Sequence, residues 1–468
     1  MSAPKLKAPR GTHDVLGEQA SARARIEARA RALLEVAGYE RIETPTFEAT
    51  ELFARGVGAS TDIVQKEMYT FTDGSDRSLT LRPEGTAPVC RAYVEHGMHK
   101  LRQPVKLWYL SSFFRYERAQ AGRMRQFWQV GAEALGSDEP AVDAESIVLL
   151  STLLDELGVK EVRLRLSSLG GPEARERYRE QLQAHLLAHA EDLAPEVRER
   201  IDLNPLRAFD SDHPGTRATM ATAPRLLAYL SPDDAAHFTE VMALLDEAGV
   251  AYEIDPTLVR GLDYYTRTVF ELTSDALGAQ SGVGGGGRYD GLVEMIKGPP
   301  TPGPPTPGMG WAMGVERAML ASNTPADVPP AIDLYIAFEE GEKAKENAQG
   351  GRPTIVRGLG EGLGSQAQPP AGTVASVASV GTTARTAFKV LHEARSAGLA
   401  AQMELAGRSL KNQLGHAERL GARYIAIVGG GDDAGVGETM LEDTQARTRE
   451  NVPTETVVHA VLRGLHDL

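Results

Sequence analysis

The sequence predicts an α+β protein of two parts, a large mixed unit and a smaller unit in which strands and helices alternate. Apolar and aromatic runs at 106–117 and 126–136 flank an arginine-rich loop, a pattern typical of a long antiparallel hairpin. Residues 172–248 are polar with helically spaced leucines, which predicts a helical insertion. From residue 332 onward strand-like and helix-like stretches alternate, which predicts a small α/β unit.

The composition is that of a globular protein without a membrane segment. The chain of 468 residues is long enough for two or three domains, and 42% hydrophobic and 24% charged residues are ordinary for a soluble protein. No run of 18 apolar residues and no secretory signal occurs, so we expect a cytoplasmic protein. The lone Cys90 excludes an intramolecular disulfide and a cysteine metal site.

The net charge of −14 argues against nucleic-acid binding by the surface as a whole. A local basic patch would be enough, however, and residues 115–125 and 411–423 are candidates. Solvated helix faces and turns remain a plausible alternative for each stretch taken separately.

The N-terminal region predicts a helix followed by an edge strand. Residues 18–37 carry a helical stripe of apolar side chains, and Gly38 stands where a C-terminal cap belongs. The following segment, YERIETPTFE, is extended in character but contains Pro45, which favours an edge or interface strand.

Residues 67–93 predict two short strands around a DGSD turn, then a loop and a helix. Glu84 and Thr86 lie in that loop, where binding residues are often displayed. A carboxylate followed by a hydroxyl suits recognition of an α-ammonium group. Helix capping is the alternative, because Thr86 directly precedes a helical run.

The predicted hairpin places polar side chains on one face of each strand. Arg115 and Glu117 share a face of the first strand, while Gln129 and Glu133 share a face of the second with Phe127 and Gly131. Polar groups flanked by aromatic rings make a poor core but a good pocket floor. Arg115 could hold an α-phosphate, and Gln129 and Glu133 could accept hydrogen bonds from an imidazole ring or an ammonium group.

The insertion contains His185 and His189, one helical turn apart. We interpret this pair as part of a surface helix face, because the sequence offers no evident third zinc ligand.

A second concentration of functional residues begins at VRGLDYYTRTVFEL. On a strand, Arg260 and Tyr264 point the same way, and a cation beside a phenol suits a small anionic ligand. The glycines at 284–287 would let the backbone approach that ligand closely. The alternative is an ordinary hairpin with a glycine-rich turn. Further on, GMGWAMGVER alternates glycine with large apolar residues before a helix that Arg317 opens.

Four stretches together resemble the class II aminoacyl-tRNA synthetases, in the form found in the histidyl-tRNA synthetase family. They are LRPEGTAPVCRAY, FRYERAQAGRMRQFWQVGAE, RGLDYYTRTVFEL and GMGWAMGVER, to which GGRYDGL adds a histidine-specific motif. The resemblance implies an antiparallel-sheet catalytic domain over 1–325, with the helical insertion at about 172–248 touching the tRNA acceptor arm. It also implies an α/β anticodon-binding domain over 326–468, after a linker at 321–331.

One segment departs from the family pattern. Residues 342–379 are rich in Gly, Ala, Pro, Ser and Gln where a short link to a helix is expected. We predict a disordered insertion there, which leaves the contacts with the anticodon open.

The resemblance implies a histidine–tRNA ligase that uses ATP and Mg²⁺, forms histidyl-adenylate from L-histidine and transfers the histidyl group to tRNA(His). It implies a homodimer through the first helix and the segment around Pro45. The catalytic residues it implies are Arg260 and Arg115, and it predicts no metal ligands among the protein side chains. The implied histidine-binding residues are Glu84, Thr86, Gln129, Glu133, Tyr264, Tyr265 and Tyr289. The implied ATP-binding residues are Arg115, Glu117, Arg123 and Arg317.

Two other functions compete with this one. The regulatory subunit of ATP phosphoribosyltransferase has the same catalytic fold but normally lacks the C-terminal domain. Both that domain and the RGLDYYTRTVFE motif are present here, which counts against this function. A synthetase-like RNA-sensing module usually has degraded catalytic residues, whereas Glu84, Arg115, Gln129, Glu133 and Arg260 all stand here. A P-loop ATPase is excluded, because no GxxxxGK[ST] motif occurs.

Overall fold

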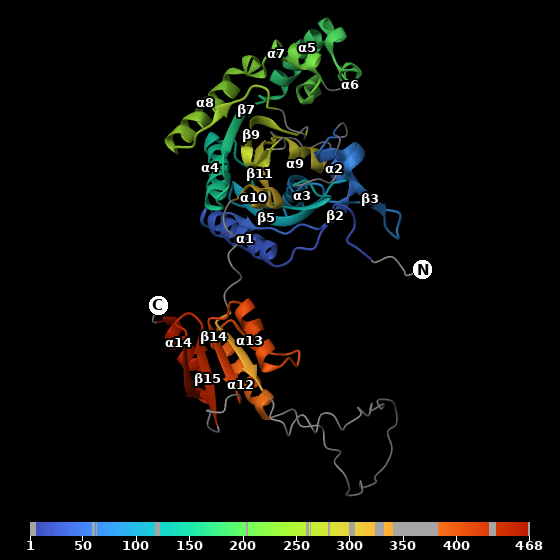
Figure 1. Ribbon diagram of the computed structural model, residues 1–468. Coiled ribbons are helices and arrows are strands. Elements are labelled where there is room, and N and C mark those ends of the chain that lie inside the picture. Colours follow the sequence, from blue (N-terminus) through green and yellow to red (C-terminus); the bar gives the residue numbers. More distant parts are fainter. Residues whose placement is uncertain are drawn as a thin grey trace, which may run out of the picture. The chain divides into compact units, whose positions relative to one another are not determined.

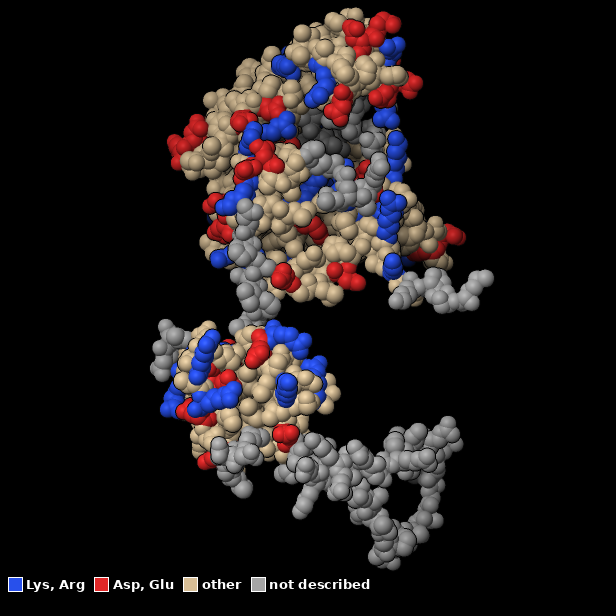
Figure 2. Space-filling view, in the orientation of Figure 1, with Lys and Arg blue, Asp and Glu red and all other residues tan. Residues whose placement is uncertain are grey.

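The structure, a computed structural model, divides the chain into two units, Met1–Asp327 and Val328–Leu468 (Figure 1). It describes residues 6–58, 61, 63–117, 122–202, 205–258, 262, 264–278, 281–298, 305–322, 332–339, 382–429 and 437–466. The predicted insertion at 342–379 lies outside the described residues. On the face shown in Figure 2, acidic and basic side chains are interspersed over the first unit, so no single sign of charge dominates there.

An eight-stranded sheet forms the centre of the first unit, and it is antiparallel except at its two edges. In the order in which they lie, the strands are β1 (Glu40–Arg41), β5 (Val105–Phe114), β6 (Gln126–Leu135), β11 (Gly308–Gly314), β10 (Gly282–Arg288), β9 (Thr266–Ser274), β7 (Val162–Ser168) and β8 (Glu253–Ile254). The hairpin of β5 and β6 pairs in continuous register from Val105 opposite Leu135 to Phe114 opposite Gln126. The predicted antiparallel catalytic sheet is therefore confirmed.

A small three-stranded sheet stands beside the large one, in the order β2 (Phe47–Ala49), β4 (Ser78–Leu81), β3 (Tyr69–Thr72). The helices of this unit are α1 (Glu18–Val36), α2 (Thr50–Gly56), α3 (Thr86–Glu95), α4 (Pro140–Glu156), α5 (Pro172–Ala188), α6 (Pro195–Arg198), α7 (Pro214–Ala221), α8 (Pro232–Glu247), α9 (Leu292–Lys297) and α10 (Val315–Ala321).

The extended segment predicted around Pro45 is divided into two strands in the structure. β1 pairs with β5 at the edge of the large sheet, and β2 belongs to the small sheet. Residues 42–46 between them are irregular, and the buried Arg82 fastens them by donating to the carbonyls of Thr44 at 2.6 Å and Pro45 at 3.3 Å. Proline lacks a backbone donor, so Pro45 suits a segment outside the ladder.

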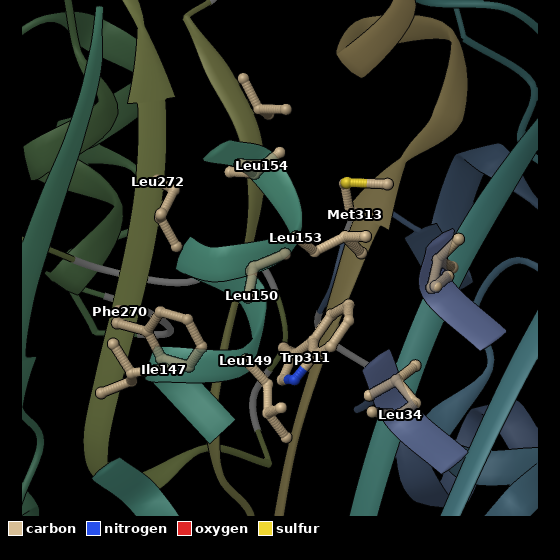
Figure 3. Close-up of a cluster of buried hydrophobic side chains, with 14 of the residues drawn as sticks. Leu34, Ile147, Leu149, Leu150, Leu153, Leu154, Phe270, Leu272, Trp311 and Met313 are labelled. Carbon is tan, nitrogen blue, oxygen red and sulfur yellow. The ribbon is translucent and has the colours of Figure 1, made fainter. Parts of the chain in front are cut away.

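One face of the large sheet is covered by an apolar core (Figure 3). Leucines of α4 pack against side chains of β9 and β11 and against α1; the residues labelled in Figure 3 are Leu34, Ile147, Leu149, Leu150, Leu153, Leu154, Phe270, Leu272, Trp311 and Met313. Alternate residues of a strand face opposite ways, so the neighbours of these core residues point to the other face. On β6, for example, Val130 and Ala132 are in this core, whereas Glu133 contacts Thr86 on the other side.

The other face of the sheet packs against α3 and α9. A second apolar cluster lies there, and it includes the aromatic rings of Tyr109, Tyr264 and Tyr289 together with the buried Cys90. This arrangement puts Gln129 and Glu133 of β6, two of the predicted site residues, on the face that carries the tyrosines.

The helical insertion has a core of its own, to which α5 contributes Tyr178, Leu182 and Leu186. Helix α8 differs from the rest of the region, because its Phe238, Val241 and Leu245 belong to the main core with α4. The last helix of the insertion is therefore part of the body that carries the sheet.

The second unit contains a five-stranded sheet in the order β13 (Ala401–Met403), β12 (Leu334–Phe338), β14 (Tyr424–Val428), β15 (Glu438–Asp443), β16 (Thr448–Pro453). The first three strands are parallel and the last two antiparallel. Helices α12 (Thr382–Ser396) and α14 (Val457–His466) contribute to the core on one face, and α13 (Leu410–Arg419) to that on the other. The hairpin of β15 and β16 departs from the predicted alternation of strands and helices, because three strands, β14, β15 and β16, follow one another before the last helix.

None of the described helices is both long and apolar enough to cross a membrane.

Candidate active site

A cleft lies on the face of the large sheet that carries the tyrosines, and it has two connected ends. The first, here called the carboxylate end, is lined by residues that include Glu84, Thr86, Tyr109, Tyr264, Tyr265, Tyr289 and Gly310. The second, the arginine end, is lined by residues that include Glu117, Phe127, Gly282, Glu316 and Arg317. Both ends share Arg115, Arg123, Gln129, Glu271, Gly285 and Ala312. The two ends therefore form one continuous site.

The carboxyl group of Glu133 organises the carboxylate end from directly behind its wall. It is almost completely buried, with 1% of the residue exposed, and it accepts three hydroxyl hydrogen bonds. Thr86 donates at 2.8 Å, Tyr289 at 2.7 Å and Tyr109 at 3.3 Å. When Glu133 is ionised, each of the three hydroxyls gives its proton to the carboxylate, and the hydroxyl oxygen presents lone pairs to a ligand. Burial raises the pKa of Glu133 to about 8, and the hydrogen bonds from Tyr289 and Thr86 oppose that rise.

Glycines at two positions make room for these side chains. A Cβ atom on Gly131 would lie 2.3 Å from the Tyr109 ring, and one on Gly310 would lie 1.7 Å from Glu133 Oε2. Real Cβ contacts are never so short, so any other residue at either position would displace the ring or the carboxylate. The glycine spacing on β6 and β11 is thus a requirement of the pocket.

The sequence left open whether Glu84 and Thr86 bind a ligand or cap a helix, and the structure shows different contacts for each. The Glu84 carboxylate accepts from the backbone N–H groups of Thr86 at 2.7 Å and Ala87 at 3.0 Å, so it caps the N-terminus of α3. The Thr86 hydroxyl points to Glu133 instead of capping the helix. Burial raises the pKa of Glu84, and the two backbone donors oppose that rise. Both residues line the cleft, so capping and ligand binding are compatible.

Three tyrosine rings pack together on the opposite wall. The centroid of the Tyr264 ring lies 4.8 Å from that of Tyr265 and 5.9 Å from that of Tyr289. Burial raises the pKa of Tyr264 and of Tyr289 well above the usual value, so both phenols stay protonated at neutral pH. The wall is therefore neutral and able to exchange hydrogen bonds, and its rings are inclined to one another, at 50° for Tyr264 and Tyr265 and 74° for Tyr264 and Tyr289.

The arginine end gathers positive charge around a shallow floor. Arg115 donates from Nε to the Pro83 carbonyl at 2.9 Å, and its guanidinium lies 5.3 Å from the Phe127 ring centroid. Arg123 pairs with Glu117 at 2.6 Å. Arg317 donates to the carbonyls of Gly122, at 3.0 Å, and Gly282.

Electrostatics indicate what the arginine end can bind. Burial lowers the pKa of Arg317, and the positive charge of Arg123 lowers it further, although Glu117 acts the other way. A bound polyanion would relieve the repulsion between these guanidinium groups. Phosphate oxygens match the donor geometry of arginine, so this end suits a nucleoside triphosphate.

The structure brings together eleven of the twelve residues predicted for the site. Of these eleven, only Glu133 does not line the cleft. It lies behind the wall and accepts hydrogen bonds from hydroxyls of residues that do line it. Arg260 lies outside the described residues. Tyr109 was missed, although it lies an even number of residues before Arg115 and so on the face of that strand that carries a predicted site residue.

Among the described residues, His185 and His189 do not belong to a metal-binding group. Within the described parts of the chain, no group of three or more His, Cys, Asp or Glu side chains is placed to hold a metal ion. His185 and His189 instead bond to the carbonyls of Thr219 and His185, at 3.0 and 2.9 Å.

Comparisons with known proteins agree on one family. The model of the family described as histidyl-tRNA synthetase matches residues 11–318. A histidine–tRNA ligase of Desulforudis audaxviator (strain MP104C) is 43% identical over 98% of this chain and 99% of its own length. The corresponding protein of Halorhodospira halophila is 42% identical over 99% of both chains. The crystal structure of apo S. aureus histidyl-tRNA synthetase matches with a TM-score of 0.73 and 32% identity, over 98% of this chain and 100% of that one.

Proposed function

The chain belongs to the histidyl-tRNA synthetase family, and we propose that the cleft of its first unit is where histidine and ATP react. Its activity is that of a histidine–tRNA ligase, a class II aminoacyl-tRNA synthetase. The reading as a regulatory subunit of ATP phosphoribosyltransferase is not favoured, because the histidine–tRNA ligases match nearly the full length of the chain.

The hydrogen bonds that Glu133 accepts are the observation on which the assignment of histidine to the carboxylate end rests. In its ionised form Glu133 accepts the protons of Thr86, Tyr109 and Tyr289 and turns three hydroxyl oxygens into acceptors, and a cationic histidine bound beside it favours that form. A histidine substrate brings an imidazole N–H and an α-ammonium group that need such acceptors. We assign Gln129, Tyr264 and Tyr265 to the same binding site, with Glu84 at its edge.

At the arginine end the histidine carboxylate would attack the α-phosphorus of ATP. An oxygen–phosphorus bond forms and the bond from that phosphorus to pyrophosphate breaks, so negative charge shifts to the leaving group. Arg115, at the junction of the two ends, is placed to stabilise the α-phosphate, and Arg317 and Arg123 the outer phosphates. Guanidinium groups stay protonated, so these residues act by position and charge and not as bases. We assign the remaining catalytic role to Arg260 on sequence grounds.

ATP is the family's energy source, and Mg²⁺ is its typical companion. Mg²⁺ usually binds one or two carboxylates together with substrate phosphates, and Glu117 and Glu271 both line the arginine end. These two residues would hold the ion, which would neutralise charge on the phosphates.

The test of substrate identity is histidine-dependent exchange of pyrophosphate into ATP. A site that hydrogen-bonds the imidazole ring should prefer histidine to phenylalanine or leucine by about 10⁴-fold in kcat/KM. Comparable exchange with phenylalanine would overturn the assignment of Glu133 and its hydroxyl partners.

For the second unit we propose anticodon-arm binding of tRNA(His). Support comes from Arg408, Lys411 and Arg419, which are exposed on or beside α13, where basic side chains are visible in Figure 2. A chain truncated after Ser322 should keep pyrophosphate exchange and lose most tRNA charging. Deletion of 342–379 alone should do much less harm. Unchanged tRNA charging by the truncated chain would overturn the proposal.

We also propose a cytoplasmic homodimer formed through α1 and the segment around Pro45. Large apolar side chains are exposed nearby, namely Val36 at 92%, Phe47 at 51% and Phe71 at 42%, and such patches favour a partner. Light scattering at micromolar concentration should give twice the mass of the chain. A fully active monomer would contradict it.

A further inference from the structure

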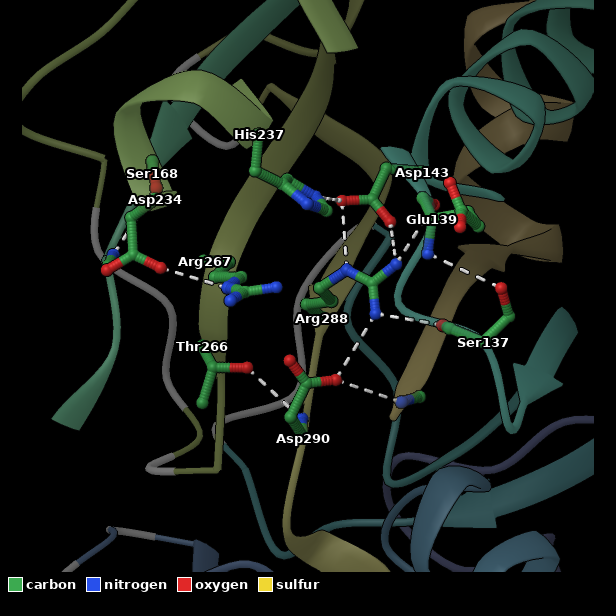
Figure 4. Close-up of polar contacts among 12 residues, drawn as sticks. Ser137, Glu139, Asp143, Ser168, Asp234, His237, Thr266, Arg267, Arg288 and Asp290 are labelled. Carbon is green, nitrogen blue, oxygen red and sulfur yellow. Dashed lines mark hydrogen bonds and ion pairs between the residues drawn. The ribbon is translucent and has the colours of Figure 1, made fainter. Parts of the chain in front are cut away.

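Arg288, the residue before Tyr289, is the centre of a buried polar network beneath the carboxylate end (Figure 4). Its side chain is 0% exposed and makes five acceptor contacts, of which four are hydrogen bonds and one is an ion pair. Two go to Asp143, at 2.6 and 3.1 Å, and two to the carbonyls of Ser137 at 3.0 Å and Glu139 at 3.3 Å. The fifth goes to Asp290 at 3.3 Å. Lysine has three donors, so it cannot reproduce this set.

The same network fixes both sides of Tyr289. Its backbone N–H donates to the Gly308 carbonyl at 2.8 Å, and the Gly308 N–H donates to Asp290 at 3.1 Å. The Asp290 N–H in turn donates to the Thr266 hydroxyl at 3.1 Å. Tyr289 therefore has little freedom to move its hydroxyl, which donates to Glu133 at 2.7 Å.

Helix α8 is tied to the network through His237. The His237 Nε2 atom donates to Asp143 at 2.8 Å, and both side chains are buried. Farther toward the start of α8, Asp234 accepts from Arg267 at 2.9 Å and from the Gly171 N–H at 2.9 Å. Arg267 follows Thr266 directly, so this second tie reaches the same end of β9. Helix α8 closes the helical insertion, so the insertion and the histidine pocket share one set of polar contacts.

Stability alone is a weak explanation for such a network. Buried ion pairs are often no more stabilising than well-packed apolar residues of similar volume. What such a network of directional contacts supplies is a defined geometry, here for the peptide that carries Tyr289.

We propose that Arg288 is a positioning residue for histidine binding, and that Asp143 and His237 make the affinity for histidine depend on the seating of helix α8. The proposal rests on the function assigned above to Tyr289 and Glu133. None of these three residues lines the cleft, so their effect must pass through Tyr289.

The experiment measures KM and kcat for histidine and ATP by pyrophosphate exchange in four variants of the full chain. His237→Leu removes the donor to Asp143, and His237→Gln keeps an N–H donor at similar reach. Arg288→Lys keeps the charge but loses part of the donor set. Leu245→Val is the matched control, because it weakens apolar packing near the other end of α8 and leaves the polar contacts of Asp234 and His237, which seat the helix on the network, in place.

His237→Leu should raise KM for histidine about fivefold and Arg288→Lys about tenfold, with kcat and KM for ATP nearly unchanged. His237→Gln and Leu245→Val should keep the wild-type KM. If Leu245→Val raised KM as much as His237→Leu, or if neither network variant changed it in folded protein, the coupling would be wrong. Absence of histidine-dependent exchange in the wild type would instead overturn the function on which the coupling rests.

Discussion

The two ends of the cleft solve different problems with different chemistry. At the carboxylate end, Glu133 is buried and three hydroxyls already donate to it at 2.7–3.3 Å. At the arginine end, the guanidinium groups are only partly buried or exposed, and they lie near one another around a floor of glycines. The first end is complete before a ligand arrives, whereas the second holds positive charge that a polyanion would balance.

This difference indicates how selectivity and rate are separated. Discrimination among amino acids requires polar groups that are fixed before binding, because a loose site can adapt to the wrong ligand. Stabilisation of the reacting phosphate requires charge at the place where charge develops. Changes at the two ends should therefore affect different kinetic constants.

Removal of Arg115 should give the largest effect. We expect Arg115→Ala to lower kcat for pyrophosphate exchange by about 10²–10³-fold, the usual loss when one stabiliser of developing charge is removed. KM for histidine should change much less. Arg163→Ala, which removes an exposed partner of Asp275 outside the cleft, is the control. A nearly normal kcat would mean that Arg115 only anchors the hairpin through the Pro83 carbonyl.

Glu133→Gln should have the next largest effect on pyrophosphate exchange, and it changes the carboxylate end of the cleft. Above pH 8 the ionised Glu133 accepts from all three hydroxyls, whereas the amide of the variant must donate to one of them, which turns that hydroxyl's proton toward the ligand. We expect kcat/KM for histidine to fall about 10- to 100-fold, the range for a hydrogen bond that involves a charged group. KM for ATP should stay the same. An equal rise in both KM values would show that the two ends are not separable.

A pair of conservative variants refines the description of the carboxylate end. Tyr289→Phe removes a hydroxyl at 2.7 Å from Glu133, and Tyr109→Phe removes one at 3.3 Å. We expect KM for histidine to rise about tenfold in the first and about twofold in the second, since the shorter contact is the stronger. The opposite order would mean that Tyr109 contacts the substrate more closely than Tyr289 does.

The smallest predicted effect concerns stability and pH. The pKa of Glu133 is about 8 in the folded protein and starts from 4.5, so between those values the folded state binds more protons than the unfolded state. The free energy of unfolding must then fall as the pH rises through that interval. Glu133→Gln removes this titration. Its melting temperature relative to the wild type should therefore increase from pH 5 to pH 8. Parallel melting curves would show that Glu133 is already ionised in the folded protein.

Much of the site could be predicted because strands have a simple period. Alternation put Gln129 and Glu133 on one face of β6, and the structure places Gln129 on the cleft and Glu133 just behind it. The depth of Glu133 could not be predicted, because it depends on Gly310 from a strand far away in sequence. The same holds for Tyr109, whose ring occupies the space above Gly131 on the paired strand.

The fold was predictable where apolar patterns were strong. The hairpin of β5 and β6 has aromatic residues along both strands, and the structure confirms it. The strand β16 has the sequence TRENVP, is mostly exposed and lies at a sheet edge, so it carries no apolar alternation to detect. Helix α8 was assigned to the insertion by its polarity, but its contacts with α4 depend on tertiary packing that local patterns do not encode.

The burial of Cys90 has a practical consequence for labelling chemistry. It is the chain's one cysteine, it lies in the cluster with Tyr264 and Tyr289, and burial raises the pKa of its thiol well above the usual value. Maleimides and iodoacetamides react with thiolates, so the folded protein should take up almost no reagent. A cysteine introduced at the exposed Glu418 of α13 would then carry a single fluorophore, with no native thiol to remove first. The chain is thus ready for fluorescence titrations of tRNA against its second unit.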